Sequence, residues 1–132
     1  MADQFILVDT DILIDVSRGI TQAIETLEKL QEDHILAISV VTQMELMVGC
    51  ENKKEFKQLE NFLKRFKIIQ LTEGISTKAV ELFKEYRLSH GVLIADMLIA
   101  STAITHEIEL ISKNQKDYTF IEDLELRKYI AE

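Results

Sequence analysis

The sequence predicts an α/β domain with a parallel sheet, and three observations support this fold class. Short apolar runs that suit buried strands alternate with segments in which apolar residues recur at helical spacing. Proline is absent and glycine occurs only four times, so no flexible linker divides the chain. The length of 132 residues is typical of one domain. We therefore expect a single domain over residues 1–132.

Four segments are predicted as strands. Phe5–Val8 is entirely apolar and Leu36–Val41 is interrupted only by Ser39, as is typical of parallel strands buried on both faces. Lys67–Gln70 and Leu110–Ser112 are shorter candidates for a third and a fourth strand. Ligands of parallel sheets bind beyond the carboxyl ends of the strands, so functional residues are expected just after these segments.

Helices are predicted between the strands. Apolar residues recur at helical spacing from Phe56 to Phe66 and again from Ile75 to Tyr86, and both stripes are expected to face the core. Further helix candidates are Ile20–Leu30, Gln43–Val48 and Leu93–His106.

Composition excludes several other classes of protein. Apolar residues make up 47% of the chain and charged residues 29%, as in folded soluble domains and unlike disordered segments. No apolar run exceeds four residues, whereas a membrane span needs about twenty. The single cysteine, Cys50, and the lack of a secretory signal predict a cytoplasmic protein, and no zinc-site spacing is present.

Charge is distributed unevenly along the chain. The formal net charge of −8 argues against binding to nucleic acid by bulk charge. Between Glu51 and Lys67, however, six basic residues stand against three acidic ones (net +3), whereas the remainder has 9 basic and 20 acidic residues (net −11). The helix predicted from the stripe Phe56 to Phe66 lies in this segment, and its outer face is expected to carry, on or near it, Lys53, Lys57 and Lys64. Both a polyanion-binding surface and an ordinary solvated helix face are consistent with this pattern.

Asp9 directly follows the first predicted strand. It is either the N-cap of a helix over Asp11–Ser17, since aspartate is a favoured cap, or a carboxylate at the ligand-binding edge of the sheet. Glu45 has a comparable alternative, because its position three residues after Thr42 predicts a capping box at the start of Gln43–Val48. Glu45 would also lie one turn into a helix that begins at the same edge as Asp9, and the two roles are compatible.

Two further acids complete the set. Asp96 interrupts the apolar segment Val92–Ala100, where a carboxylate is costly unless it is paired or bound to a metal. Asp117 lies in a polar loop after the fourth strand and carries little weight alone. Parallel topology would bring both to the edge that holds Asp9 and Glu45, where carboxylates repel unless a proton or a cation neutralises them. Oxygen ligands in this number favour Mg²⁺ or Mn²⁺.

Four segments in this order resemble the PIN-domain family, in particular its VapC-type toxin ribonucleases: Phe5–Asp15, Ser39–Leu46, Asp96–Ala100 and Ser112–Tyr118. The resemblance extends from about Phe5 to Leu126. It implies a three-layer α/β/α sandwich with a central parallel sheet and Mg²⁺- or Mn²⁺-dependent cleavage of single-stranded RNA. It also implies homodimers and inhibition by a cognate antitoxin protein.

The resemblance also implies roles for individual residues. The acids of the family, catalytic and metal-binding, map onto Asp9, Glu45, Asp96 and Asp117. Thr10 takes the place of the small hydroxyl residue after the first acid, and Asn114 is expected to shape the loop before Asp117. Asp123 lies near enough in sequence to be a rival for the fourth acid. Asp11 departs from the pattern, since many members carry asparagine there.

We therefore hypothesise a metal-dependent endoribonuclease, the toxin of a toxin–antitoxin pair, with Lys53, Lys57 and Lys64 as candidates for holding the RNA backbone. One alternative is a catalytically inactive PIN-like module that binds RNA or protein. The other is a haloacid-dehalogenase-like phosphatase, because Asp9 and Asp11 after a strand also fit a nucleophile and an acid. That fold usually needs a longer chain.

Overall fold

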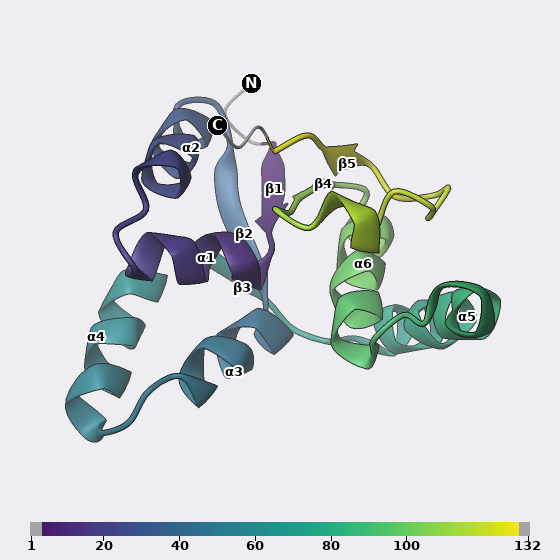
Figure 1. Ribbon diagram of the computed structural model, residues 1–132, viewed down its shortest axis with the longest axis horizontal. Coiled ribbons are helices and arrows are strands. Elements are labelled where there is room, and N and C mark those ends of the chain that lie inside the picture. The colour runs from purple at the N-terminus through teal and green to yellow at the C-terminus, as the bar shows by residue number, and fades with distance from the viewer. Residues whose placement is uncertain (1–3, 130–132) are drawn as a thin grey trace.

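In the computed structural model, which describes residues 4–129, five parallel strands form a central sheet (Figure 1). They are β1 (Phe5–Val8), β2 (Ile35–Ser39), β3 (Lys67–Ile69), β4 (Glu109–Ile111) and β5 (Leu126–Arg127). The spatial order is β3-β2-β1-β4-β5, so β1 lies at the centre. Leu7 of β1 pairs with Ala37 on one side and with Leu110 on the other. The predicted α/β class with a parallel sheet is confirmed.

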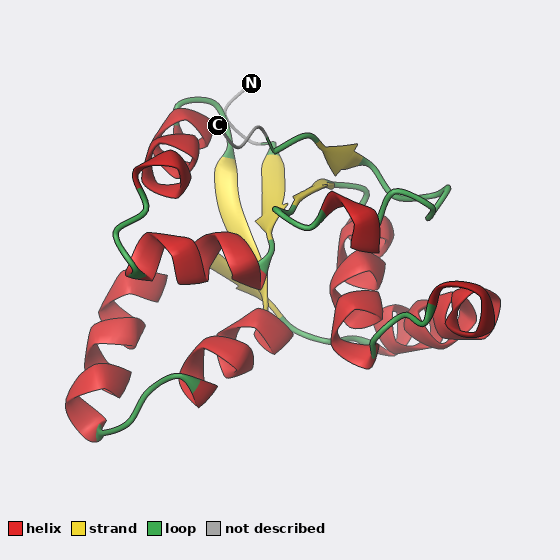
Figure 2. Cartoon of the chain, viewed as in Figure 1, coloured by secondary structure: helices red, strands yellow, loops and turns green. Residues whose placement is uncertain are grey.

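Helices cover both faces of this sheet (Figure 2). The described part of the chain forms α1 (Thr10–Ser17), α2 (Thr21–Gln31), α3 (Val40–Val48), α4 (Lys53–Leu63), α5 (Glu73–His90), α6 (Ile94–His106) and the short 3₁₀ helix η1 (Gln115–Asp117). Residues of α1, α2 and α4 build the core on one face, and residues of α5 and α6 build the core on the other. This is the three-layer arrangement that the resemblance implied. Within residues 4–129, no helix is both long enough and apolar enough to cross a membrane.

Alternate residues of β1 enter the two cores. Ile6 and Val8 pack against α1, α2 and α4, whereas Leu7 packs against the layer that contains α5 and α6. All three side chains are fully buried. Because successive side chains of a strand point to opposite faces, a sheet that is covered on both sides requires an uninterrupted apolar run.

The second predicted strand, Leu36–Val41, is two residues too long. β2 ends at Ser39, whose hydroxyl oxygen accepts a hydrogen bond from the backbone N–H of Val41 at 3.0 Å and caps α3. The predicted helix Gln43–Val48 therefore begins three residues earlier, at Val40. Valine favours strands, but the serine cap and the burial of Val41 in the core override that preference.

The other predicted elements differ little from the observed ones. Strands predicted at Lys67–Gln70 and Leu110–Ser112 are β3 and β4, each displaced by at most one residue. The helices predicted at Ile20–Leu30 and Leu93–His106 are α2 and α6. β5 was not predicted, because a strand of two residues has no periodicity to recognise.

The carboxyl ends of β1, β2 and β4 meet at one edge of the sheet. α1 starts two residues after β1 ends, α3 follows β2 directly, and η1 begins four residues after β4 ends. These tight connections bring the first turn of α1 beside both the first turn of α3 and the loop that leads into η1. The fold therefore concentrates residues 9–11, 39–45 and 112–118 at this edge.

Candidate active site

Asp9 has both roles that the sequence left open. It is the N-cap of α1, because its Oδ1 accepts a hydrogen bond from the backbone N–H of Thr10 at 2.8 Å. Its other oxygen, Oδ2, accepts hydrogen bonds from the hydroxyls of Ser112 at 2.8 Å and Tyr118 at 3.1 Å. The cap uses one carboxylate oxygen, and the second is directed into the polar edge. The side chain is 6% exposed.

The environment of Asp9 opposes its negative charge. Burial, together with the nearby charge of Asp11, raises the pKa of its carboxyl to about 7. Hydrogen bonds from Ser112 and Thr10 lower the pKa and offset only part of this effect. A carboxylate in this condition is stabilised by a proton or a cation.

Asp96 lies in the first turn of α6 and is half-buried, not enclosed by apolar side chains as its sequence neighbours suggested. Its Oδ1 lies 3.4 Å from the hydroxyl of Tyr118. Burial, followed by the charges of Asp117 and Glu45, raises the pKa of Asp96 to about 6. The predicted convergence of acids from separate elements is therefore present at this edge, and we call Asp9, Glu45, Asp96 and Asp117 the acid edge.

The capping-box hypothesis for Glu45 is wrong. Because α3 begins at Val40 with Ser39 as its cap, Thr42 and Glu45 both lie inside the helix. Glu45 instead accepts a hydrogen bond through Oε1 from the hydroxyl of Thr10, at 2.5 Å. The hydroxyls of Thr10 and Thr42 lie 2.9 Å apart, which ties α1 to α3 beneath the carboxylate.

Asp117 is exposed in η1, and after burial its charge is the largest cause of the raised pKa of Asp96. Asp123, the rival for the fourth acid, forms an ion pair with Lys78 at 3.1 Å. The position of Asp117 depends on the loop that starts at Asn114, whose backbone carbonyl accepts a hydrogen bond from the N–H of Asp117 at 3.1 Å.

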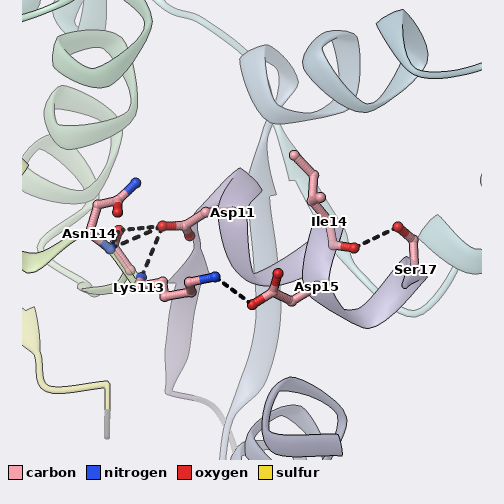
Figure 3. Close-up of polar contacts among 7 residues, drawn as sticks. Asp11, Ile14, Asp15, Ser17, Lys113 and Asn114 are labelled. Carbon is pink, nitrogen blue, oxygen red and sulfur yellow. Dashed lines mark hydrogen bonds and ion pairs between the residues drawn. The ribbon is translucent and has the colours of Figure 1, made fainter. Parts of the chain in front are cut away.

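Asp11 anchors that loop to α1, as Figure 3 shows. Its Oδ2 accepts hydrogen bonds from the backbone N–H groups of Lys113 at 3.1 Å and Asn114 at 3.0 Å. One turn along α1, Asp15 forms an ion pair with the Lys113 ammonium at 2.8 Å. Asn114 therefore contributes to the loop through its backbone N–H group. Asp11 holds this loop in place, a role that the family pattern did not indicate.

Sequence reasoning did not select Ser112 or Tyr118. Ser112 ends the fourth predicted strand, so the strand-end rule that selected Asp9 could have found it. No sequence pattern pointed to Tyr118, because a tyrosine in a loop is not by itself typical of an active site. Burial, and next the charges of Asp9 and Asp96, raise its pKa, so the phenol remains a hydrogen-bond donor.

The donor set of the acid edge fits a hard cation. All four of its side chains offer oxygen ligands, and burial and like charge disfavour the ionised forms of Asp9 and Asp96. Oδ1 of the neighbouring Asp11 is buried with no hydrogen-bond partner. Within residues 4–129, no three acidic, histidine or cysteine side chains surround a common point in the manner of a preformed metal site. The acid edge therefore fits a cation through its oxygen ligands and through the meeting of acids from separate elements, and not through a preformed coordination geometry.

A groove is lined by residues of α1, α3 and α4, and Glu45 is the acid-edge residue that enters it. It has a volume of about 580 Å³ and is lined by Ile14, Arg18, Glu45, Cys50, Gln58 and Phe62, among others. Cys50 is half-buried, as expected for a small apolar side chain. Lys53, Lys57 and Lys64 are exposed as predicted. The prediction that the whole stripe faces the core is wrong at Phe56, which is 38% exposed.

Comparison with known proteins identifies the family of this chain. The sequence pattern of the PIN domain matches residues 6–121. The chain belongs to the PIN-domain family. It is 35% identical over 120 residues to ribonuclease VapC10 of Mycobacterium tuberculosis, a match that covers 90% of each chain. It is 32% identical over 126 residues to ribonuclease VapC1 of Methanocaldococcus jannaschii, covering 94% of this chain and 86% of that one.

Solved structures have the same PIN-domain fold. A toxin–antitoxin complex from Klebsiella pneumoniae contains a chain with a TM-score of 0.76 and 34% identity, covering 94% of this chain and 97% of that one. VapBC2 from Rickettsia felis, bound to a DNA fragment from its promoter, gives a TM-score of 0.80 at 29% identity, covering 96% and 100%. Membership of the PIN-domain family excludes the haloacid-dehalogenase-like alternative.

Proposed function

We propose that this PIN domain is a metal-dependent endoribonuclease that cleaves single-stranded RNA and acts as the toxin of a toxin–antitoxin pair. The observation that supports this most directly is the acid edge, where burial and like charge raise the pKa of Asp9 and Asp96. Such acids are typical of a site that is completed by a cation. The similarity to VapC ribonucleases supports the same activity.

Mg²⁺ or Mn²⁺ would be held by Asp9, Glu45, Asp96 and Asp117. When bound, such an ion supplies a water of lowered pKa as nucleophile and offsets charge on the scissile phosphate. The chain itself orients the ligands: Ser112 donates to Asp9, and Thr10 donates to Glu45. Asp11 holds the loop that carries Asp117.

Three binding partners belong to this proposal. Single-stranded RNA would contact Lys53, Lys57 and Lys64 through its phosphates, since these side chains are exposed in or just after α4, and other residues of α4 line the groove together with Glu45. An antitoxin protein is proposed because the similar solved structures are toxin–antitoxin complexes. A second copy of the chain would cover exposed apolar side chains such as Leu93. The expected setting is the cytoplasm.

Incubation of the purified protein with labelled single-stranded RNA, with Mn²⁺ or with a chelator, tests the proposal. We expect internal cleavage only with the metal, and its loss in Asp96→Asn. Asp123→Asn is the matched control, because that acid pairs with Lys78 outside the acid edge. RNA binding without cleavage under any condition would favour the inactive binding module.

A further inference from the structure

Tyr118 joins the core of the domain to the acid edge. Its side chain is 1% exposed and packs in the same core cluster as Met97 of α6 and Ile121. The backbone is held on both sides, because the N–H of Tyr118 donates to the carbonyl of Gln115 and the N–H of Ile121 donates to the carbonyl of Tyr118. The ring is therefore a rigid support, and its hydroxyl has a defined position.

That hydroxyl lies between two carboxylates from different elements. It is 3.1 Å from Oδ2 of Asp9, after β1, and 3.4 Å from Oδ1 of Asp96, in the first turn of α6. A phenol has one proton to donate, whereas two acceptors of like charge face it. The hydroxyl therefore shares its one proton between the two carboxylates in a three-centre hydrogen bond, with the shorter contact to Asp9. No other described side chain is hydrogen-bonded to both acids.

We propose that Tyr118 is a positioning residue that fixes the relative orientation of the Asp9 and Asp96 carboxylates for cation binding. This inference rests on the proposed function, because it concerns how the acid edge receives its metal. Like-charged carboxylates repel, and Asp96 is only half-buried, so without a fixed neighbour its side chain is free to rotate toward solvent. Groups that orient metal ligands by hydrogen bonding typically change metal affinity by about 10- to 100-fold.

Tyr118→Phe removes the hydroxyl and keeps the ring that fills the core. Calorimetric titration with Mn²⁺ should show binding weakened by about tenfold relative to wild type, and the Mn²⁺ concentration for half-maximal RNA cleavage should rise in parallel. Tyr86→Phe is the matched control, since Tyr86 is half-buried and packs against Phe120 and His90 away from the acids. A purely structural role would lower the melting temperature but leave Mn²⁺ affinity unchanged. Affinity equal to or above wild type in Tyr118→Phe overturns the inference.

A second measurement uses the wild-type protein and does not depend on the folding of a variant. Titration with Mg²⁺, followed by nuclear magnetic resonance, should shift the ring signals of Tyr118 and leave those of Tyr86 in place. Unchanged Tyr118 signals at saturating Mg²⁺ overturn the inference. Its failure is distinguishable from failure of the proposed function: if wild type and Asp96→Asn both fail to bind either metal, the metal-dependent function itself is wrong, and the inference with it.

Discussion

Two clusters of ionisable side chains lie at opposite ends of the same sheet, and their charges are balanced differently. At the amino ends of the strands, His34 precedes β2 and Glu109 begins β4. Arg127 pairs with Glu109 at 2.9 Å, and His34 lies 2.7 Å from Asp33 and 3.8 Å from Glu109. At the carboxyl ends, the acid edge contains Asp9 and Asp96, whose pKa values are raised by burial and by neighbouring carboxylates.

The difference lies in the signs of the charges and not in burial alone. The side chain of His34 is only 7% exposed, yet acceptors and a cation surround it. The acid edge has hydroxyl and backbone donors but no ion pair to Asp9 or Asp96 within residues 4–129. A cluster whose charges are balanced internally needs no further charge, whereas one whose charges are unbalanced is stabilised by a proton or a cation.

Asp9→Asn should produce the largest contrast between the two ends. Cleavage of RNA with Mn²⁺ should fall by about 100-fold or more, because a bound cation contributes several kcal/mol of transition-state stabilisation. Asparagine can still cap α1, so circular dichroism should be unchanged. Glu109→Gln, at the balanced end, should keep full cleavage and lose at most about 1 kcal/mol of stability. Equal loss of cleavage in both variants would remove the distinction between the clusters.

The same Asp9→Asn variant should be more stable than wild type at high pH when metal is removed. The pKa of Asp9 is raised from 3.8 to about 7, so the folded state binds this proton more tightly than the unfolded state. The resulting stabilisation is fully present below about pH 4 and is lost as the pH rises through about 7. Urea unfolding with chelator at pH 8 should show a gain of about 4 kcal/mol in Asp9→Asn, against almost none at pH 4. Identical pH dependence in wild type and variant would contradict this account.

Glu45→Gln tests whether Glu45 belongs to the active site or only supports the fold. Since Glu45 does not cap α3, removing its charge should leave the melting temperature nearly unchanged. Cleavage should fall by about tenfold, as for other losses of an outlying metal ligand or ligand-orienting group. A fall in stability without a fall in activity would place Glu45 among the structural residues, with its bond to Thr10 as the reason.

Simultaneous replacement of Lys53, Lys57 and Lys64 by Gln should have the smallest effect. RNA binding should weaken several-fold, and the slope of log affinity against log salt should decrease by about 2, because three phosphate contacts are lost. Mn²⁺ affinity and melting temperature should stay at wild-type values, since all three side chains are exposed. Wild-type affinity and slope would make this segment a solvated face and direct the search for the RNA path elsewhere.

Local patterns in the sequence were sufficient to predict the strands and helices that form the layers of the fold. Uninterrupted apolar runs such as Phe5–Val8 identify strands with two covered faces, and the spacing from Ile75 to Tyr86 identifies a helix with one buried face. These are properties of neighbouring residues, so they can be recognised before folding. The end of β2 could not, because Val40 and Val41 suit a strand and only the serine cap and core packing place them in α3.

The meeting of the acids at one edge could also be predicted from the sequence, whereas their hydrogen-bond partners could not. Parallel topology sends every strand end to one edge, so Asp9, Glu45 and Asp117 could be placed together from chain order alone. The contacts of Tyr118 span 109 residues to Asp9 and 22 to Asp96. Which hydroxyl reaches which carboxylate depends on how α6, η1 and the sheet pack against one another. The sequence by itself therefore determined the elements and the edge where chemistry gathers, and the tertiary structure decided the hydrogen bonds there, because those distances are set by packing between segments that are remote in the chain.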